Sequence, residues 1–267
     1  MNDLEYLGVE VRGARERAGL SQRQFAVGTG FSQSYISKVE HGALIPSEDF
    51  ARKCDLVLGT SGLFERLRAR LVERGHPSWF APFAKMEREA EEVLDYSLWT
   101  LPGLLQTEEY ARALFRAGHP EATEDWIEKR VENRVSRRGV LTGDDPPPFW
   151  AIIHESVLLP HIGGARAMRA QLEHLLEAAS RPRVTVQVLA LTAGAPPATE
   201  PFIHLQLPRQ RSVVYTDTAL GGQLSTSDDQ VRFCRTAFER LRAEALSPTM
   251  STRLIRKIAK ELPHDDD

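Results

Sequence analysis

Cysteine is scarce in this sequence and follows no pattern. The 267 residues contain only Cys54 and Cys234, which lie far apart and outside any Cys-x-x-Cys spacing. A disulfide framework is therefore excluded, and the spacing gives no sign of a zinc site. We expect both cysteines to be reduced residues that pack in protein cores, and we expect no metal and no cofactor.

Long hydrophobic runs are absent as well. No apolar stretch approaches the ~20 residues that a membrane-spanning helix needs. The first five residues are acidic and lack the basic and apolar parts of a secretory signal. We therefore expect a cytoplasmic protein that does not enter a membrane.

Neither sign of charge is in large excess. The formal net charge is -3; residues 1–75 carry 11 basic and 10 acidic side chains, a balance of +1, which leaves -4 for the rest. Because phosphate binding draws on clustered Lys and Arg, general attraction to nucleic acid should be weak. Any DNA affinity should depend on specific contacts and on dimerisation.

The length allows two domains of ordinary size. Helical periodicity dominates the first 75 residues, and Gly75-His76-Pro77-Ser78 then interrupts the pattern as a hinge. We predict an N-terminal domain over residues 1–75 and a second domain over residues 76–267. The acidic tail from about residue 263 should be disordered.

Five helices are predicted in the first domain. The first has one apolar face made of Leu7, Val11, Ala14 and Ala18. Ser21 and Gln24 have the spacing of a capping box, so a second helix should run over residues 21–29, with Gly30 as the turn. Ser32 should cap a third helix that ends near Gly42, Pro46-Ser47 should open a fourth, and a fifth should span residues 61–74.

The second domain mixes helices and strands, so the fold class is mainly α with a small sheet (α+β). Helices are expected over residues 83–93, 107–117, 121–141, 165–179, 228–243 and 249–262. Strands are expected over residues 149–154, 183–189, 202–207 and 212–215, and the pairs Gly163-Gly164 and Gly221-Gly222 should be turns. Trp79, Trp99, Trp126 and Trp150 are expected in a packed aromatic core, with a ligand pocket as the alternative.

The third helix has the pattern of a recognition helix of a helix-turn-helix motif. Ile36 and Val39 should point into the core, while Gln33, Ser34 and Lys38 share the outward face. Gln can bind adenine through two hydrogen bonds and Lys can donate to guanine, so these side chains are candidate readers of bases. Gln22 and Arg23 are expected to position the domain on phosphates, and Tyr35 completes the expected DNA contacts. The alternative is an ordinary solvated helix face.

The segments Ser21-Gln-Arg-Gln-Phe-Ala, Gly30-Phe-Ser-Gln-Ser-Tyr-Ile-Ser-Lys-Val-Glu-His-Gly42 and Pro46-Ser47 resemble the Xre/Cro family of bacterial and phage regulators. The resemblance implies that Gln22 contacts a phosphate and braces Gln33, and that Arg15 pairs with Glu40. The second pairing agrees with the physics, because the first and third helices must pack together and a half-buried charge needs a partner.

From Trp79 onward the chain resembles the domain of unknown function of antitoxin-like Xre regulators of the Scr type. The resemblance rests on Leu101-Pro-Gly-Leu-Leu-Gln-Thr-Glu-Glu-Tyr-Ala-Arg-Ala-Leu114 and on Val186-Gln-Val-Leu189. It implies a partner, often a small protein encoded nearby. Two hypotheses stay open: a repressor or activator whose second domain senses a small ligand, and an adaptor whose second domain binds and neutralises a small protein. The first predicts an enclosed pocket with converging polar groups, and the second an exposed apolar patch or groove.

No enzyme motif occurs, so we predict a non-enzyme. His154-Glu155 begins like a zinc-protease helix, but Leu158 stands where that signature needs His, and no Walker A loop or Gly-x-Ser-x-Gly elbow is present. His154, Glu155 and His161 would have to converge in space to form a catalytic site. The partners expected are double-stranded DNA with a palindromic operator and a second copy of the chain. The second domain should carry the dimer interface, with the fourth and fifth helices as the alternative.

Overall fold

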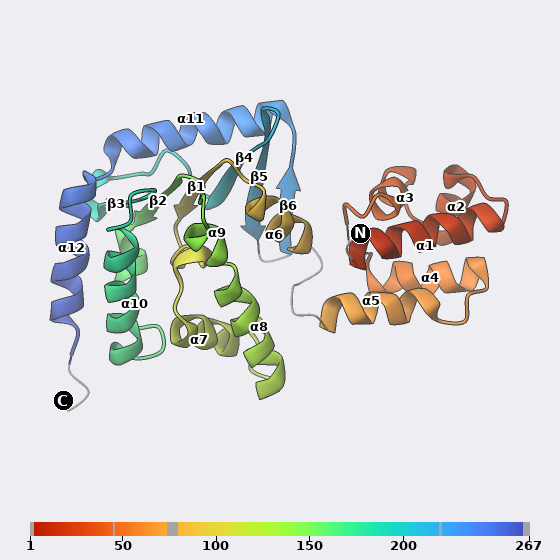
Figure 1. Ribbon diagram of the computed structural model, residues 1–267, viewed down its shortest axis with the longest axis horizontal. Coiled ribbons are helices and arrows are strands. Elements are labelled where there is room, and N and C mark those ends of the chain that lie inside the picture. The colour runs from red at the N-terminus through yellow and green to blue at the C-terminus, as the bar shows by residue number, and fades with distance from the viewer. Residues whose placement is uncertain (1–2, 45, 74–79, 219–220, 264–267) are drawn as a thin grey trace. The chain divides into compact units, whose positions relative to one another are not determined.

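The computed structural model describes residues 3–44, 46–73, 80–218 and 221–263 (Figure 1). The chain forms two compact units, Met1–Pro82 and Phe83–Asp267. The hinge expected at residues 75–78, Trp79 and the last four residues of the expected tail lie outside the described residues. No helix in the described part is long and apolar enough to cross a bilayer.

The first unit contains the five helices that the sequence predicts. They are α1 (Asp3–Arg17), α2 (Gln22–Thr29), α3 (Gln33–Glu40), α4 (Glu48–Leu58) and α5 (Leu63–Glu73). Their first turns are fixed by local hydrogen bonds. The Ser21 side chain accepts from the backbone N–H of Gln24 while the Gln24 side chain accepts from the N–H of Ser21, which completes the capping box.

Helices α3 and α4 also begin at serine caps, and glycines shape the turns. Ser32 accepts from the N–H of Tyr35 and Ser47 from the N–H of Phe50. Gly42 has a φ of 62° and lies so close to α1 that a Cβ there would come within 2.9 Å of the Cα of Glu5. A larger residue at this position would therefore push the turn after α3 away from α1.

The core of the first unit is where the helices meet. Leu7, Val11 and Ala14 of α1 are buried as predicted, but Ala18 follows the end of α1 and is exposed. The apolar side chains that complete the core include Phe25, Ile36, Val39, Phe50, Cys54 and Phe64. Burial of these side chains gives the first unit a core of its own, so it does not need the second unit to bury them.

One mixed sheet of six strands lies in the described part of the second unit, in the order β3-β2-β1-β4-β5-β6. The strands are β1 (Glu92–Ser97), β2 (Phe149–His154), β3 (Val184–Leu189), β4 (Phe202–Leu207), β5 (Arg211–Thr218) and β6 (Gly221–Ser225). The pairs β1–β2 and β2–β3 are parallel, whereas β1–β4, β4–β5 and β5–β6 are antiparallel. The sheet is larger than the small one expected.

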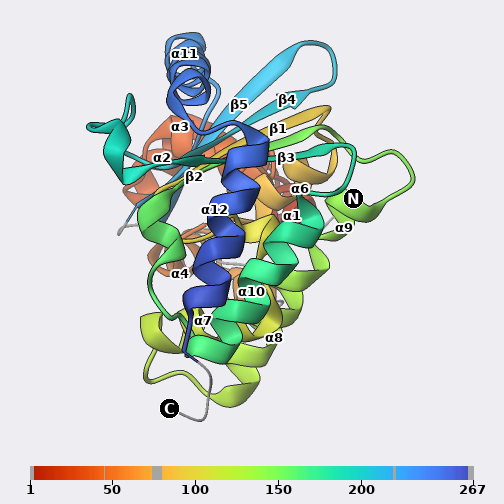
Figure 2. The same ribbon diagram turned by 90° about the vertical axis from the view of Figure 1, so that its left-hand side faces the viewer.

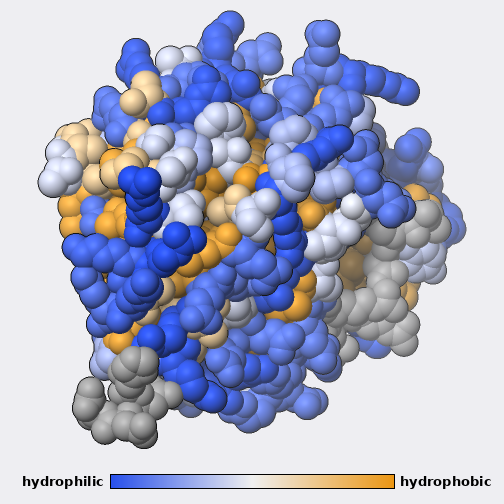
Figure 3. Space-filling view, turned by 60° about the vertical axis from the view of Figure 1, so that its left-hand side comes forward, coloured by the Kyte–Doolittle hydropathy of each residue, from blue (hydrophilic) through white to orange (hydrophobic). Residues whose placement is uncertain are grey.

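Helices cover both faces of this sheet. They are α6 (Ala81–Arg88), α7 (Glu108–Gly118), α8 (Glu124–Ser136), α9 (Gly139–Thr142), α10 (Ala165–Ala178), α11 (Asp228–Glu244) and α12 (Pro248–Glu261). Helix α11 runs along one face, and α7, α8, α10 and α12 extend away on the other side (Figures 1 and 2). The surface is mostly hydrophilic on the side shown in Figure 3, with apolar residues in the recesses between charged ones.

Three predictions for the second unit are wrong. The helix expected over residues 83–93 ends at Arg88, and β1 follows. Five of the six β1 residues are buried, so the strand lacks the alternation that marks a half-buried one. Gly221 and Gly222 lie in β6 rather than in a turn, and the helix expected over residues 121–141 is divided into α8 and α9.

The described tryptophans do not form the expected aromatic core. Trp99 is 68% exposed, and Trp126 lies beneath the guanidinium of Arg130 at 3.4 Å. Trp150 donates its indole N–H to Gln187 at 2.9 Å, lies beside Arg242 and packs against the apolar core beneath α11, without contact to another tryptophan among the described residues. Each ring therefore serves a separate local contact.

Candidate nucleic-acid interface

Helix α3 divides into a buried and an exposed face. Ile36 and Val39 are fully buried, while Gln33, Ser34 and Lys38 are exposed. The Ser32 cap fixes the first turn, from which a recognition helix reaches base edges. The three candidate readers are thus on the accessible side of a helix that is anchored by its other side.

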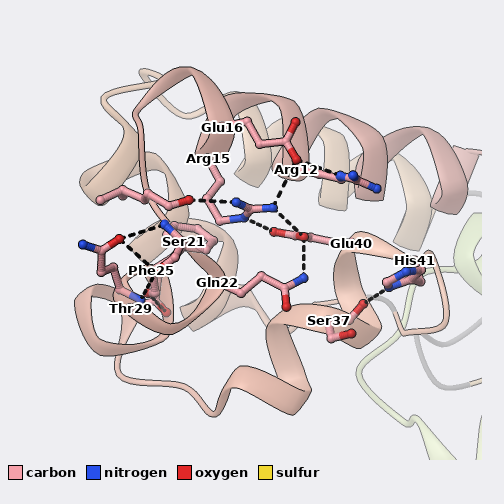
Figure 4. A network of polar contacts seen from close by, with 12 residues as sticks. Arg12, Arg15, Glu16, Ser21, Gln22, Phe25, Thr29, Ser37, Glu40 and His41 are labelled. Atoms are coloured by element: carbon pink, nitrogen blue, oxygen red, sulfur yellow. Dashed lines mark hydrogen bonds and ion pairs between the residues drawn. The ribbon is translucent and has the colours of Figure 1, made fainter.

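A bidentate ion pair joins α1 to α3 (Figure 4). The Nε of Arg15 donates to Oε1 of Glu40 at 2.5 Å, and Nη2 donates to Oε2 at 3.0 Å. A third donor, Nη1, binds the backbone oxygen of Leu20 at 2.7 Å. The hydrogen bond to Glu40 raises the pKa of Arg15 above its usual value, although burial opposes it. The structure therefore contains the expected Arg15–Glu40 pair.

Gln22 belongs to the same network. Its amide donates to Oε2 of Glu40 at 2.8 Å (Figure 4), and no hydrogen bond within the described residues joins it to Gln33. The bracing contact inferred from the resemblance therefore goes to the last residue of α3 instead of its first. In this way Glu40 connects α1, the start of α2 and the end of α3.

Tyr35 is more internal than the other candidate contacts. Its ring stacks on Phe31 with centroids 4.8 Å apart and lies 5.1 Å from the ring of Phe50. Its hydroxyl accepts a hydrogen bond from the N–H of Ser47 at 2.8 Å. Tyr35 thus ties α3 to the start of α4, and only the part of its side chain that remains accessible can face DNA.

Arg23 and Lys38 supply the positive charge at this surface. Both are exposed, and neither forms an ion pair with another residue in the described ranges. Unpaired, flexible cations of this kind can bind phosphate oxygens without first breaking an internal pair. The geometry therefore suits base contacts from Gln33, Ser34 and Lys38 and a phosphate contact from Arg23.

The histidines considered for catalysis have structural contacts or stand apart. The Nδ1 of His154 lies 2.6 Å from the hydroxyl of Ser156, and Oε2 of Glu155 accepts from the N–H of Leu191 at 2.8 Å. His161 is exposed in the loop before α10. Among the described residues there is no group of three side chains that could hold a metal ion.

Buried charges in the second unit were not anticipated. Arg137 binds Glu87 through two hydrogen bonds of 2.8 Å, and Asp95 accepts from the hydroxyl of Ser97 at 2.7 Å. Burial raises the pKa of Asp95 to about 7, and the Ser97 hydrogen bond opposes the shift. Arg137 and Glu87 are 50 residues apart and meet only through tertiary packing, and the burial of Asp95 depends on the strands that pair with β1 on both sides, so no local sequence pattern indicates either feature.

Two family descriptions match the chain. The description "Helix-turn-helix domain" matches residues 6–71, and "Domain of unknown function (DUF5753)" matches residues 80–257. The first match spans α1 to α5, and the second covers the sheet and all helices from α6 to most of α12. No curated protein and no solved structure matches the chain.

Proposed function

The chain belongs to the family described as Domain of unknown function (DUF5753) and begins with a helix-turn-helix domain, and from these two facts we propose that it is a sequence-specific transcriptional regulator. The unit Met1–Pro82 binds double-stranded DNA and the unit Phe83–Asp267 controls that binding. A regulator of this kind works in the cytoplasm, beside the DNA, and acts by binding rather than by catalysis.

One observation carries the proposal: α3 buries Ile36 and Val39 completely and leaves Gln33, Ser34 and Lys38 exposed. Base readout needs polar side chains that are free to meet base edges, on a helix that cannot move relative to its domain. The Arg15–Glu40–Gln22 network supplies that rigidity, because it holds both ends of the motif together.

The operator is a palindrome bound by a homodimer. A single first unit has an excess of only one positive charge and offers few phosphate contacts. Two half-sites bound together, with recognition helices ~34 Å apart, would bring the affinity to the usual range for specific sites. The second unit has the larger surface and is the proposed place of the dimer interface.

The test is selection of bound sequences from a random DNA library by the full-length protein. The expected result is an enriched palindrome whose half-sites are one helical turn apart. Enrichment of a single half-site would refute the homodimer, and no enrichment of any sequence would refute sequence-specific DNA binding.

A second candidate keeps the DNA-binding unit and gives the other unit a different task. As in the antitoxin-like Scr type of Xre regulators that the sequence resembles, it would hold and neutralise a small protein encoded nearby. Phe233, an aromatic residue 66% exposed on α11, favours this candidate, because large exposed apolar residues often mark protein contacts. Co-expression with the product of a neighbouring small gene would test it: Phe233→Ser should abolish co-purification of the two proteins.

A further inference from the structure

A cavity of about 440 Å³ lies between α11 and the sheet of the second unit. Side chains of β1, β4 and β5 line one wall, and residues of the first two turns of α11 line the other. Its volume falls within the ~300–1,000 Å³ range of small-molecule sites. The cavity is therefore large enough for a metabolite that would touch helix and sheet together.

His204 of β4 forms part of this lining, and one nitrogen of its ring is left unsatisfied. It is 2% exposed, and its Nδ1 is buried without a partner among the described residues. Because Phe202 on the same face of β4 packs against Phe238 of α11, His204 also faces that helix. A buried polar atom without a partner costs stability, and a bound group that supplies the missing hydrogen bond is one physical explanation for it in a native protein.

The imidazole of His204 is suited to a polar ligand rather than to a charge of its own. Burial lowers the pKa of His204, and the nearby charge of Arg235 lowers it further. The ring is therefore neutral at physiological pH, with one nitrogen that donates and one that accepts.

Charge around the cavity is balanced. Glu92 pairs with Arg235, and Arg232 pairs with Asp229 outside the lining, so the lining itself holds two carboxylates, Glu92 and Asp228, and two guanidinium groups. Val231 is the one apolar side chain among the lining residues that the structure describes. A ligand with a single net charge would disturb this balance, whereas a ligand with groups of both signs can form hydrogen bonds to the lining carboxylates and guanidinium groups and leave the balance unchanged.

The hairpin between β4 and β5 places one more polar side chain at the cavity, and its backbone is strained there. Arg209 and Gln210, in the three-residue connection between Leu207 and Arg211, have φ angles of 62° and 58°, in the left-handed region that Gly or Asn usually fills in turns. Gln210 lines the cavity and Arg209 does not. Strained residues of this kind are concentrated at ligand sites, where the side chain outweighs the strain.

We propose that this cavity is a binding site for a small zwitterionic metabolite of the α-amino-acid type. The carboxylate of the ligand binds Arg232 and Arg235, its ammonium group binds Asp228 and Glu92, and His204 completes the hydrogen bonds. Binding itself is independent of the proposed DNA function; only its consequence, control of operator affinity, rests on that function.

The test is titration calorimetry of the full-length protein, without DNA, against each free L-amino acid. The expected result is that at least one binds with a Kd below about 1 mM, and that its N-acetyl and carboxamide derivatives bind at least tenfold more weakly. Failure of every amino acid to bind, or equal binding of the two derivatives, would overturn the proposal.

Two matched pairs of variants locate the site. Arg232→Ala should weaken binding about tenfold, because charge-assisted hydrogen bonds are lost, whereas Arg240→Ala on the same helix but outside this cavity should not. Gln210→Gly and Arg209→Gly both relieve strain and should keep or raise the Tm, but only Gln210→Gly should weaken binding. Equal affinities within either pair would place the ligand elsewhere.

The control of DNA binding is measured separately, by titrating operator DNA with and without the amino acid. A ligand that binds but leaves operator affinity unchanged would support the site and count against the regulatory function. Absence of operator binding under all conditions would refute the DNA-binding function and leave the calorimetric result standing.

Discussion

Arg15 of α1 and Glu40 of α3 share two hydrogen bonds in the interior of the first unit, with side chains 9% and 1% exposed. Glu40→Ala leaves the buried guanidinium of Arg15 without its main partner, so it should lower the free energy of unfolding by about 3 kcal/mol. Urea denaturation of the full chain measures it. Arg12→Ala is the control, because the Arg12–Glu16 pair on the same helix is exposed and should contribute little. Equal losses for both variants would show that the buried pair contributes no more to stability than the exposed one.

Base readers and phosphate contacts should separate by their salt dependence. Gln33→Ala should weaken operator binding by about 1–3 kcal/mol and leave binding to random DNA unchanged, because base contacts give specificity. Arg23→Ala should weaken both and lower the salt slope by about one. Fluorescence anisotropy at several salt concentrations measures both effects. Arg52→Ala, an exposed change on α4, serves as the control. If Gln33→Ala weakened binding to operator and random DNA equally, Gln33 would not be a reader.

The dimer interface should map to the second unit. In analytical ultracentrifugation the full chain is expected to sediment as a dimer and the fragment of residues 1–82 as a folded monomer, since that fragment contains a complete core. The fragment should also bind a half-site weakly. A stable dimer of the fragment would move the interface to α4 and α5.

Stability of the second unit should fall as pH rises from about 4 to 7. The pKa of Asp95 is about 7 in the folded chain, so the unfolded chain ionises first and loses its proton at lower pH. Asp95→Asn stays neutral and can still accept from Ser97. It should stabilise the protein by up to about 4 kcal/mol at pH 8, at ~1.4 kcal/mol per pKa unit, and hardly at pH 4.

Thermal unfolding at the two pH values checks this prediction. Asp229→Asn, which changes an exposed carboxylate of α11, should show no such pH dependence. A gain of equal size at both pH values would show that the pKa of Asp95 is the same in the folded and the unfolded chain.

Both cysteines should resist thiol reagents until the protein opens. Burial raises the pKa of Cys54 and of Cys234, and only thiolates react quickly. Cys234 should react first, because it lines a second cavity of about 440 Å³, between α11 and strands β5 and β6 and distinct from the proposed ligand site. Cys54, in contrast, is fully buried in the helical core of the first unit. Timed labelling with Ellman's reagent in Cys54→Ser and Cys234→Ser distinguishes the two. Native Cys54 reacting like a free thiol would contradict its burial.

The first unit could be predicted closely because its structure depends on local signals. Ser21, Ser32 and Ser47 each act within three residues, and the spacing of Leu7, Val11 and Ala14 is that of one helix. Even there, the partner of the Gln22 amide depended on tertiary packing and was Glu40 rather than Gln33.

The second unit was predictable where a strand showed a clear apolar pattern. Phe149–His154 and Phe202–Leu207 have the expected bounds, whereas β1 was missed because it is buried on both sides and contains two acidic residues, Glu92 and Asp95. His204 gave no signal, because a lone histidine in an apolar strand looks like any packing residue. Its significance depends on the turn residue Gln210 and on Arg235 of α11, which only the packing of α11 on the sheet brings near it.

The position of β1 in the sheet also determines the order in which the two units can fold during synthesis. Glu92 of β1 pairs with Gln206 of β4, so more than a hundred further residues must be synthesised before the two strands can form hydrogen bonds. By then every helix of the first unit has already left the ribosome, and its short-range contacts can form at once. A nascent chain therefore carries a finished DNA-binding part well before the part proposed to control it exists, and an early stop in translation would release the first without the second.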